Sequence, residues 1–86
     1  MQPHRDLNEE RAVSSVHEPI YQRLLHRLRL ARFEAGLTQI EVAEKLKKPQ
    51  PYVSKCESGE RRMDVIELKS FADIYGKTLD YFVADS

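Results

Sequence analysis

Residues 38–59 have the sequence TQIEVAEKLKKPQPYVSKCESG, and this stretch decides the fold. It predicts two short helices separated by a tight break. Thr38 can cap the first helix, because its hydroxyl can accept a backbone N–H, and Glu41 three residues later completes a capping box. The two prolines of KKPQP interrupt helical geometry, but a proline is tolerated in a first turn, so Pro51 can open the second helix. Gly59 supplies the positive φ that ends this helix.

The second helix separates an inner face from a polar outer face. Val53, Cys56 and Glu57 share the inner face, and Cys56 is expected in the core rather than in chemistry. The side chains left outside are Gln50, Pro51, Tyr52, Ser54, Lys55 and Ser58. An outer face with these polar groups and few acids suits an anionic surface.

The chain resembles the lambda-repressor-like (Cro/CI-type, XRE-family) helix-turn-helix DNA-binding domains from about Leu24 to Val83. The matching residues are Leu37, Thr38, Gln39, Val42, Ala43, Leu46, Val53, Ser54, Lys55, Glu57, Gly59 and Arg61. The resemblance implies an all-α fold, a compact five-helix domain at residues 18–86 with the helix-turn-helix at 38–58, after a flexible N-terminal arm at 1–17. In that family the second of these helices lies in the DNA major groove.

Three positions depart from the family pattern. Lys47 stands where the turn often has Gly, so a lysine is expected to adopt a positive φ at some cost. Pro49 replaces the usual Ser or Thr cap, which leaves capping to Gln50 or the backbone. Pro51 occupies a position that often reads a base; proline can touch a thymine methyl group but cannot donate, so it should specify weakly.

The resemblance and the polar outer face together predict roles for individual residues. The side chains expected to face base edges are Gln50, Pro51, Tyr52 and Lys55. The candidates for phosphate contact are Thr38, Gln39, Lys48, Ser54, Ser58, Arg61 and Arg62. Gln39 is alternatively a plain helix-start residue, and the two arginines are alternatively part of a solvated loop. The family also implies a partly buried ion pair between Arg32 and Glu57 that orients the second helix.

Three further helices are predicted around this unit. The first runs from Pro19 to about Ala35, with a core stripe of Ile20, Leu24, Leu28, Ala31 and Ala35. Asp64 caps the next helix, which runs to about Tyr75 and has an apolar stripe of Val65, Leu68, Phe71, Ala72 and Tyr75. Thr78 caps a last short helix over residues 79–83. In the family this helix often lies at a dimer interface, so the dimer candidates are Leu79, Tyr81 and Phe82, with Leu30 and Phe33.

Composition excludes several classes of protein. The 86 residues are 41% hydrophobic and 33% charged, which fits a single globular domain. No apolar run is long enough to span a membrane, and no signal peptide opens the chain. One cysteine excludes an internal disulfide. The net charge is zero, but residues 18–62 carry ten Lys and Arg against six Asp and Glu, whereas residues 63–86 carry two against five.

The leading interpretation is a cytoplasmic, bacterial or phage-encoded transcriptional regulator, a stand-alone repressor that binds double-stranded DNA as a homodimer on an inverted repeat. The alternative is an antitoxin-type module that binds a protein partner through residues 1–17 and also binds DNA. An enzyme is not expected, because Ser14, Ser15, His17 and Cys56 form no nucleophile–base set. No metal or cofactor is expected either, since no Cys/His cluster and no glycine-rich phosphate loop is present.

Overall fold

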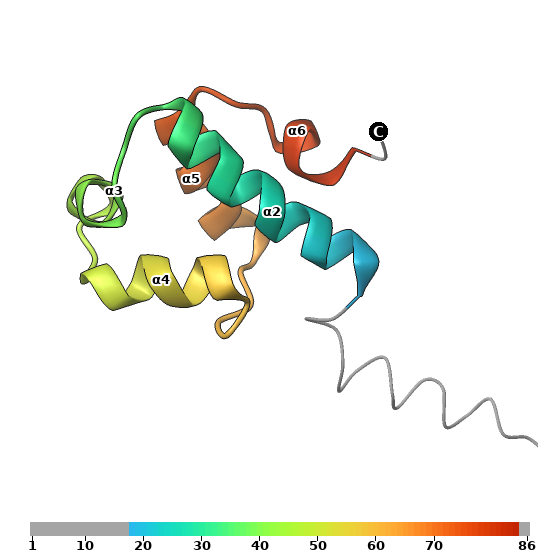
Figure 1. Ribbon diagram of the computed structural model, residues 1–86, viewed down its shortest axis with the longest axis horizontal. Helices are drawn as coiled ribbons and strands as arrows, with labels where there is room; N and C mark the ends of the chain where they lie inside the picture. The colour runs from blue at the N-terminus through green and yellow to red at the C-terminus, as the bar shows by residue number, and fades with distance from the viewer. Residues whose placement is uncertain (1–17, 85–86) are drawn as a thin grey trace, which may run out of the picture.

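The computed structural model describes residues 18–84, and this part of the chain forms five helices and no strand (Figure 1). The helices are α2 (Pro19–Glu34), α3 (Gln39–Leu46), α4 (Gln50–Ser58), α5 (Val65–Tyr75) and α6 (Leu79–Val83). The all-α prediction is confirmed. The predicted arm at residues 1–17 lies outside the described residues.

Local capping signals begin three of the helices where the sequence predicts. The Thr38 hydroxyl accepts the backbone N–H of Glu41 at 3.1 Å, and Glu41 Oε1 accepts the N–H of Thr38 at 2.9 Å. Asp64 and Glu67 form the same reciprocal box at the start of α5. Thr78 caps α6 through its hydroxyl. Each box satisfies backbone N–H groups that a helix start leaves without partners.

The turn between α3 and α4 has the strain that its sequence predicts. Lys47 ends α3 in the left-handed region at φ 61° and ψ 43°, a conformation that favours glycine. Pro49 precedes α4 without any side-chain cap, and Pro51 lies in the first turn. Gln50 therefore does not cap α4, and its side chain remains available for other contacts.

The core lies between α2 and the helices α4, α5 and α6 that pack against it, and α3 packs against α4 and α5 (Figure 1). Its fully buried side chains include Leu28, Val53, Phe71 and Phe82. Cys56 is also fully buried, as predicted, and burial raises the pKa of its thiol.

Three predicted core residues are instead exposed. Ile20 is 57% exposed because it is the second residue of α2, and the buried residues of this helix begin at Tyr21. Ala35 is exposed because α2 ends at Glu34. Val65 is 60% exposed because it is the first residue of α5, and the core begins one turn later at Leu68.

Arg27 attaches the last helix to α2. Its NH1 group donates to the backbone oxygens of Tyr81 at 3.2 Å and Ala84 at 2.5 Å. A cation at a helix C-terminus satisfies carbonyl groups that have no partner within the helix and complements the helix dipole. This contact positions α6 although the helix has only five residues.

Candidate nucleic-acid interface

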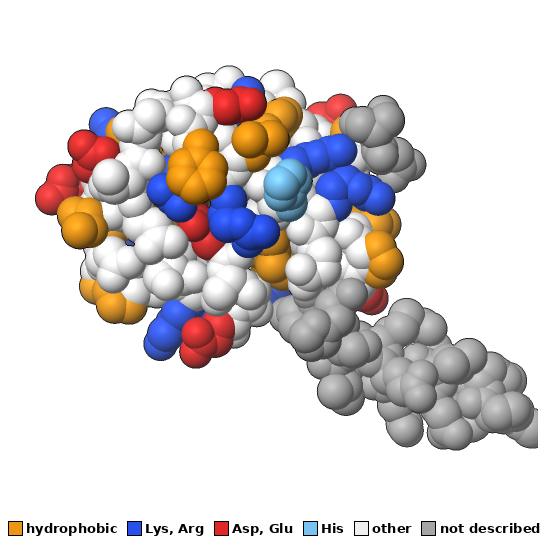
Figure 2. Space-filling view, viewed as in Figure 1, with side chains coloured by type: hydrophobic (Ala, Val, Ile, Leu, Met, Phe, Trp, Pro, Cys, Tyr) orange, Lys and Arg blue, Asp and Glu red, His pale blue; other side chains and the backbone are white. Residues whose placement is uncertain are grey.

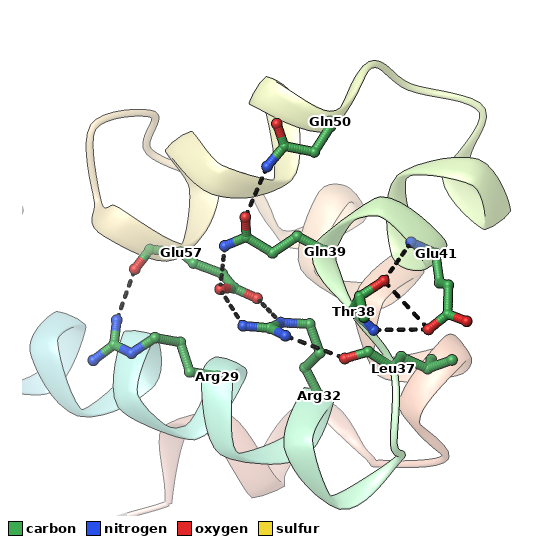
Figure 3. A network of polar contacts seen from close by, with 8 residues as sticks. All are labelled: Arg29, Arg32, Leu37, Thr38, Gln39, Glu41, Gln50 and Glu57. Atoms are coloured by element: carbon green, nitrogen blue, oxygen red, sulfur yellow. Dashed lines mark hydrogen bonds and ion pairs between the residues drawn. The ribbon is translucent and has the colours of Figure 1, made fainter.

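Polar side chains from α2 and α3 converge on Glu57 of α4 (Figure 3). Glu57 Oε2 accepts from Arg32 Nε at 2.6 Å, and Oε1 accepts from Arg32 NH2 at 3.1 Å. Arg32 NH1 also donates to the backbone oxygen of Leu37 at 3.1 Å. The structure therefore contains the ion pair expected from the sequence, and its two-pronged geometry is the strong form of an arginine–carboxylate contact.

The pair is removed from water. Arg32 is 9% exposed and Glu57 is 2% exposed. The hydrogen bond to Glu57 raises the pKa of Arg32 above its ordinary value, so the guanidinium stays charged. Arg29 adds a second link between α2 and α4, because its NH1 donates to the backbone oxygen of Glu57 at 2.8 Å. Sequence reasoning did not identify Arg29, since a single surface arginine carries no local signal of a backbone partner.

The network continues outward through two glutamines. Gln39, the first residue of α3, donates from Nε2 to Glu57 Oε1 at 2.9 Å. Its Oε1 accepts from Gln50 Nε2 at 2.8 Å (Figure 3). The first residue of α4 is thus tied to the first residue of α3, and both are tied to the buried ion pair.

Three of the four residues expected to face bases are exposed on α4. Gln50 and Pro51 are the first two residues of α4, Lys55 is the sixth, and all three side chains are exposed. Gln50 has donated one amide N–H to Gln39, which leaves its second N–H and its carbonyl oxygen for a ligand. These three residues therefore form a surface that can meet base edges.

Tyr52 is half-buried and less exposed than the sequence predicts. Its ring stacks parallel to the buried ring of Phe71, with 6.3 Å between centroids and 4° between planes. Its hydroxyl donates to Glu67 Oε2 at 3.1 Å. Burial raises the pKa of Tyr52 to about 12. Tyr52 therefore contacts α5 through its ring and its hydroxyl and links α4 to that helix while part of it remains exposed.

The phosphate candidates differ in how far their groups are already engaged. Thr38 uses its hydroxyl in the capping box, and Gln39 uses its amide in the network. Lys48 is exposed, with its Nζ 5.2 Å from the Tyr52 ring centroid. Ser54 is half-buried, and exposed Ser58 donates from its hydroxyl to the backbone oxygen of Lys55.

Arg61 and Arg62 follow α4, and each arginine lies over a different tyrosine. Arg61 donates from NH2 to Glu67 Oε2 at 2.5 Å, and its Cζ lies 5.2 Å from the ring centroid of Tyr52. Arg62 Cζ lies 4.4 Å from the ring centroid of Tyr21. Sequence reasoning missed the role of Glu67, although the Asp64-x-x-Glu67 capping box placed it at the start of α5.

The dimer candidates divide by exposure. Phe82 is fully buried in a single chain, so its assignment to an interface is wrong; its ring meets the edge of Tyr81 at 4.9 Å between centroids. Tyr81 is half-buried rather than projecting outward, and Leu79 packs partly against the core. Leu30 and Phe33 are 39% and 65% exposed.

Basic side chains are unevenly distributed over the surface. Figure 2 shows Lys and Arg gathered in a band across the face formed by α2, with Asp and Glu mostly toward its margins. Within residues 18–84 no group of three or more His, Cys, Asp and Glu side chains could hold a metal ion. None of the helices in this range is long and apolar enough to cross a membrane.

Comparison with known proteins agrees with this geometry. A family model described as helix-turn-helix matches residues 25–82. Among solved structures, the chain is similar to an XRE-family like protein from Pseudomonas syringae pv. tomato str. DC3000, with 46% sequence identity and a TM-score of 0.69. That match covers 78% of this chain and 82% of the other. No curated protein matches the chain.

Proposed function

The chain belongs to the XRE-type helix-turn-helix family of DNA-binding transcription regulators, and from this premise we propose that it is a repressor that binds an inverted-repeat operator as a homodimer. The observation that supports specific reading is the Gln50–Gln39–Glu57 chain of hydrogen bonds. It orients the first side chain of α4 before any DNA is bound. An oriented amide loses less rotational freedom on binding than a free one.

In this proposal α4 lies in the major groove. Gln50 presents one N–H and one carbonyl oxygen, the pair of groups that matches adenine N7 and N6. Pro51 contacts a thymine methyl group, and Lys55 donates to guanine O6 or N7. Tyr52 has no reading role, since its ring is stacked on Phe71.

Contacts to the phosphate backbone come from the margins of α4. The N-terminus of α3, with Gln39, meets one strand through free backbone N–H groups. Lys48 precedes α4, Arg61 and Arg62 follow it, and Ser58 adds a hydroxyl. These contacts position the protein without selecting a sequence.

A single α4 reads only a few base pairs, so two copies are needed for an operator of useful length. Homodimers of helix-turn-helix proteins place their reading helices about one DNA turn, 34 Å, apart. The exposed apolar groups available for such an interface include Val83 on α6, which is 45% exposed, together with Leu30 and Phe33 on α2. Arg27 would position α6 for this contact.

Selection of bound duplexes from a random DNA library, at about physiological salt, tests the proposal. Enrichment of an inverted repeat is expected, and its half-site spacing would give the dimer geometry. Lys55→Ala should relax selection at one base position in each half-site, whereas Arg62→Ala should weaken all sequences alike. Enrichment of a single half-site, with a monomer in gel filtration at high concentration, would refute the dimer.

A further inference from the structure

The carboxylate of Glu67, the third residue of α5, accepts hydrogen bonds from three groups. Its Oε1 accepts the backbone N–H of Asp64 at 2.9 Å, the capping contact that begins α5. Its Oε2 accepts from Arg61 NH2 at 2.5 Å and from the Tyr52 hydroxyl at 3.1 Å. One side chain is therefore shared between the start of α5, the inner side of α4 and the loop after α4.

The Tyr52 ring extends this connection to a second cation. Lys48 Nζ and Arg61 Cζ each lie 5.2 Å from the centroid of this ring. Lys48 precedes α4 and Arg61 follows it, so cations from both ends of the helix lie within reach of the same aromatic ring. Phe71 supports the ring from the core. A cation over an aromatic face is attracted by the ring quadrupole, which favours this arrangement.

Glu67 has two opposing effects on a nearby phosphate. Its negative charge repels the phosphate, but the hydrogen bond to Arg61 lowers the pKa of the carboxyl and keeps this charge paired at contact distance. The same hydrogen bond orders a long side chain that otherwise loses rotamer freedom when it binds. Arg61 keeps further N–H donors for a phosphate, since an arginine has five and its side chain is 49% exposed. The Glu67 side chain is 20% exposed and the Arg61 side chain 49%, so a phosphate in solvent meets the arginine more readily than the carboxylate, and ordering is expected to outweigh repulsion.

We propose that Glu67 is a positioning residue for DNA binding, which orders Arg61 against Tyr52 so that Arg61 and Lys48 reach the phosphate backbone together. The inference rests on the proposed DNA contact of this face, and it does not depend on an operator or on a dimer. Removing this negative charge from the protein should weaken its binding to a polyanion.

Glu67→Gln is the variant that separates the two effects. A glutamine can keep the capping contact with Asp64 through its oxygen, since Gln serves at this position of a capping box as Glu does. Its NH2 group would then replace Oε2, and an NH2 group cannot accept from Arg61. The matched control is Glu60→Gln, which removes the same charge from an exposed residue next to Arg61.

The affinity of the full chain is measured for a fluorescent duplex of arbitrary sequence, about 20 base pairs long, at low salt, where phosphate contacts dominate. Glu67→Gln is expected to bind about fivefold more weakly than wild type, or about 1 kcal/mol at 1.4 kcal/mol per tenfold. Glu60→Gln should bind equally well or more tightly. In an Arg61→Ala background the Glu67→Gln substitution should have no further effect, which a merely structural loss would not reproduce.

Binding by Glu67→Gln that equals or exceeds that of Glu60→Gln would overturn the inference. So would an unchanged fivefold loss in the Arg61→Ala background, because Glu67 would then act through the fold. Failure of the wild-type chain to bind any duplex at low salt would overturn this inference together with the proposed function. Failure of operator selection alone would leave this result standing.

Discussion

Replacing Arg32 by alanine is expected to cost this protein a large part of its stability. Arg32 supplies two of the three hydrogen bonds that Glu57 accepts through its side chain, and Glu57 is 2% exposed. Without Arg32 the carboxylate stays buried with only the amide of Gln39. Removing one partner of a buried ion pair costs about 3–5 kcal/mol. At about 0.05–0.15 kcal/mol per residue, the whole chain has about 4–13 kcal/mol of stability.

Urea unfolding followed by circular dichroism measures this loss. For a small domain with an m-value of about 1–3 kcal/mol per M, a loss of this size lowers the midpoint by at least about 1 M. The control is Lys69→Ala, which breaks the Lys69–Asp73 pair, whose side chains are 56% and 62% exposed. An exposed pair is worth about 0–1 kcal/mol, so this midpoint should move little.

The reasoning would be refuted if Arg32→Ala lost no more stability than Lys69→Ala. A second variant tests whether the loss comes from the uncompensated charge rather than from lost packing. The double substitution Arg32→Met with Glu57→Leu removes both charges and should recover much of the lost stability, since apolar side chains of similar size replace buried ion pairs well. If the double variant is as unstable as the sum of the single ones, the charge argument fails.

Three further predictions concern backbone strain and a buried hydroxyl. Gly59→Ala should destabilise the fold by more than about 2 kcal/mol in urea unfolding, because Gly59 has φ 87° and an added Cβ atom would lie 2.9 Å from Leu25 Cδ1. Gly36→Ala is the control, since Gly36 has φ 72° but open space around it, and it should cost only about 1–2 kcal/mol. Lys47→Gly should stabilise by about 0.5–1 kcal/mol by relieving the positive φ, and a lower melting temperature would contradict this. Because the pKa of Tyr52 is raised to about 12, the folded state holds this proton more tightly than the unfolded state. The contribution of the Tyr52 hydroxyl to the free energy of unfolding is therefore fully present below a pH of about 10 and is lost as the pH rises toward 12. Tyr52→Phe should reduce this loss of stability at alkaline pH.

Helix boundaries were predictable because their signals are local. The Thr38–Glu41 box lies within four consecutive residues, so the sequence contains both partners of each hydrogen bond. The left-handed conformation of Lys47 was also predictable, but only from the family resemblance, because the turn often has Gly at this position. The Arg32–Glu57 contact joins residues 25 positions apart, and only the family resemblance indicated it.

Side-chain direction was less predictable where the partner is distant. Tyr52 was expected outside because Val53, Cys56 and Glu57 define the inner face of the helix, and nothing in α4 indicates that Phe71 and Glu67 contact the side of Tyr52. Phe82 was assigned to an interface because the last helix often lies at a dimer interface in the family, and a helix of five residues is too short for its own periodicity to separate an inner face from an outer one. Its burial depends on how α6 packs against α2, and the Arg27 contacts that hold this packing span more than 50 residues.

Because the net charge is zero, the affinity of this protein for DNA depends mainly on ordered contacts at short range. A neutral molecule gains little from long-range attraction to DNA, and salt screens what remains beyond about 10 Å. Affinity must then come mainly from groups at contact distance. Such groups contribute most when they are already oriented, as Gln50 is by Gln39 and as Arg61 is by Glu67. The salt dependence of binding should accordingly report the number of phosphates contacted by these few cations, about 0.9 in slope for each, and should be insensitive to charges placed elsewhere on the protein.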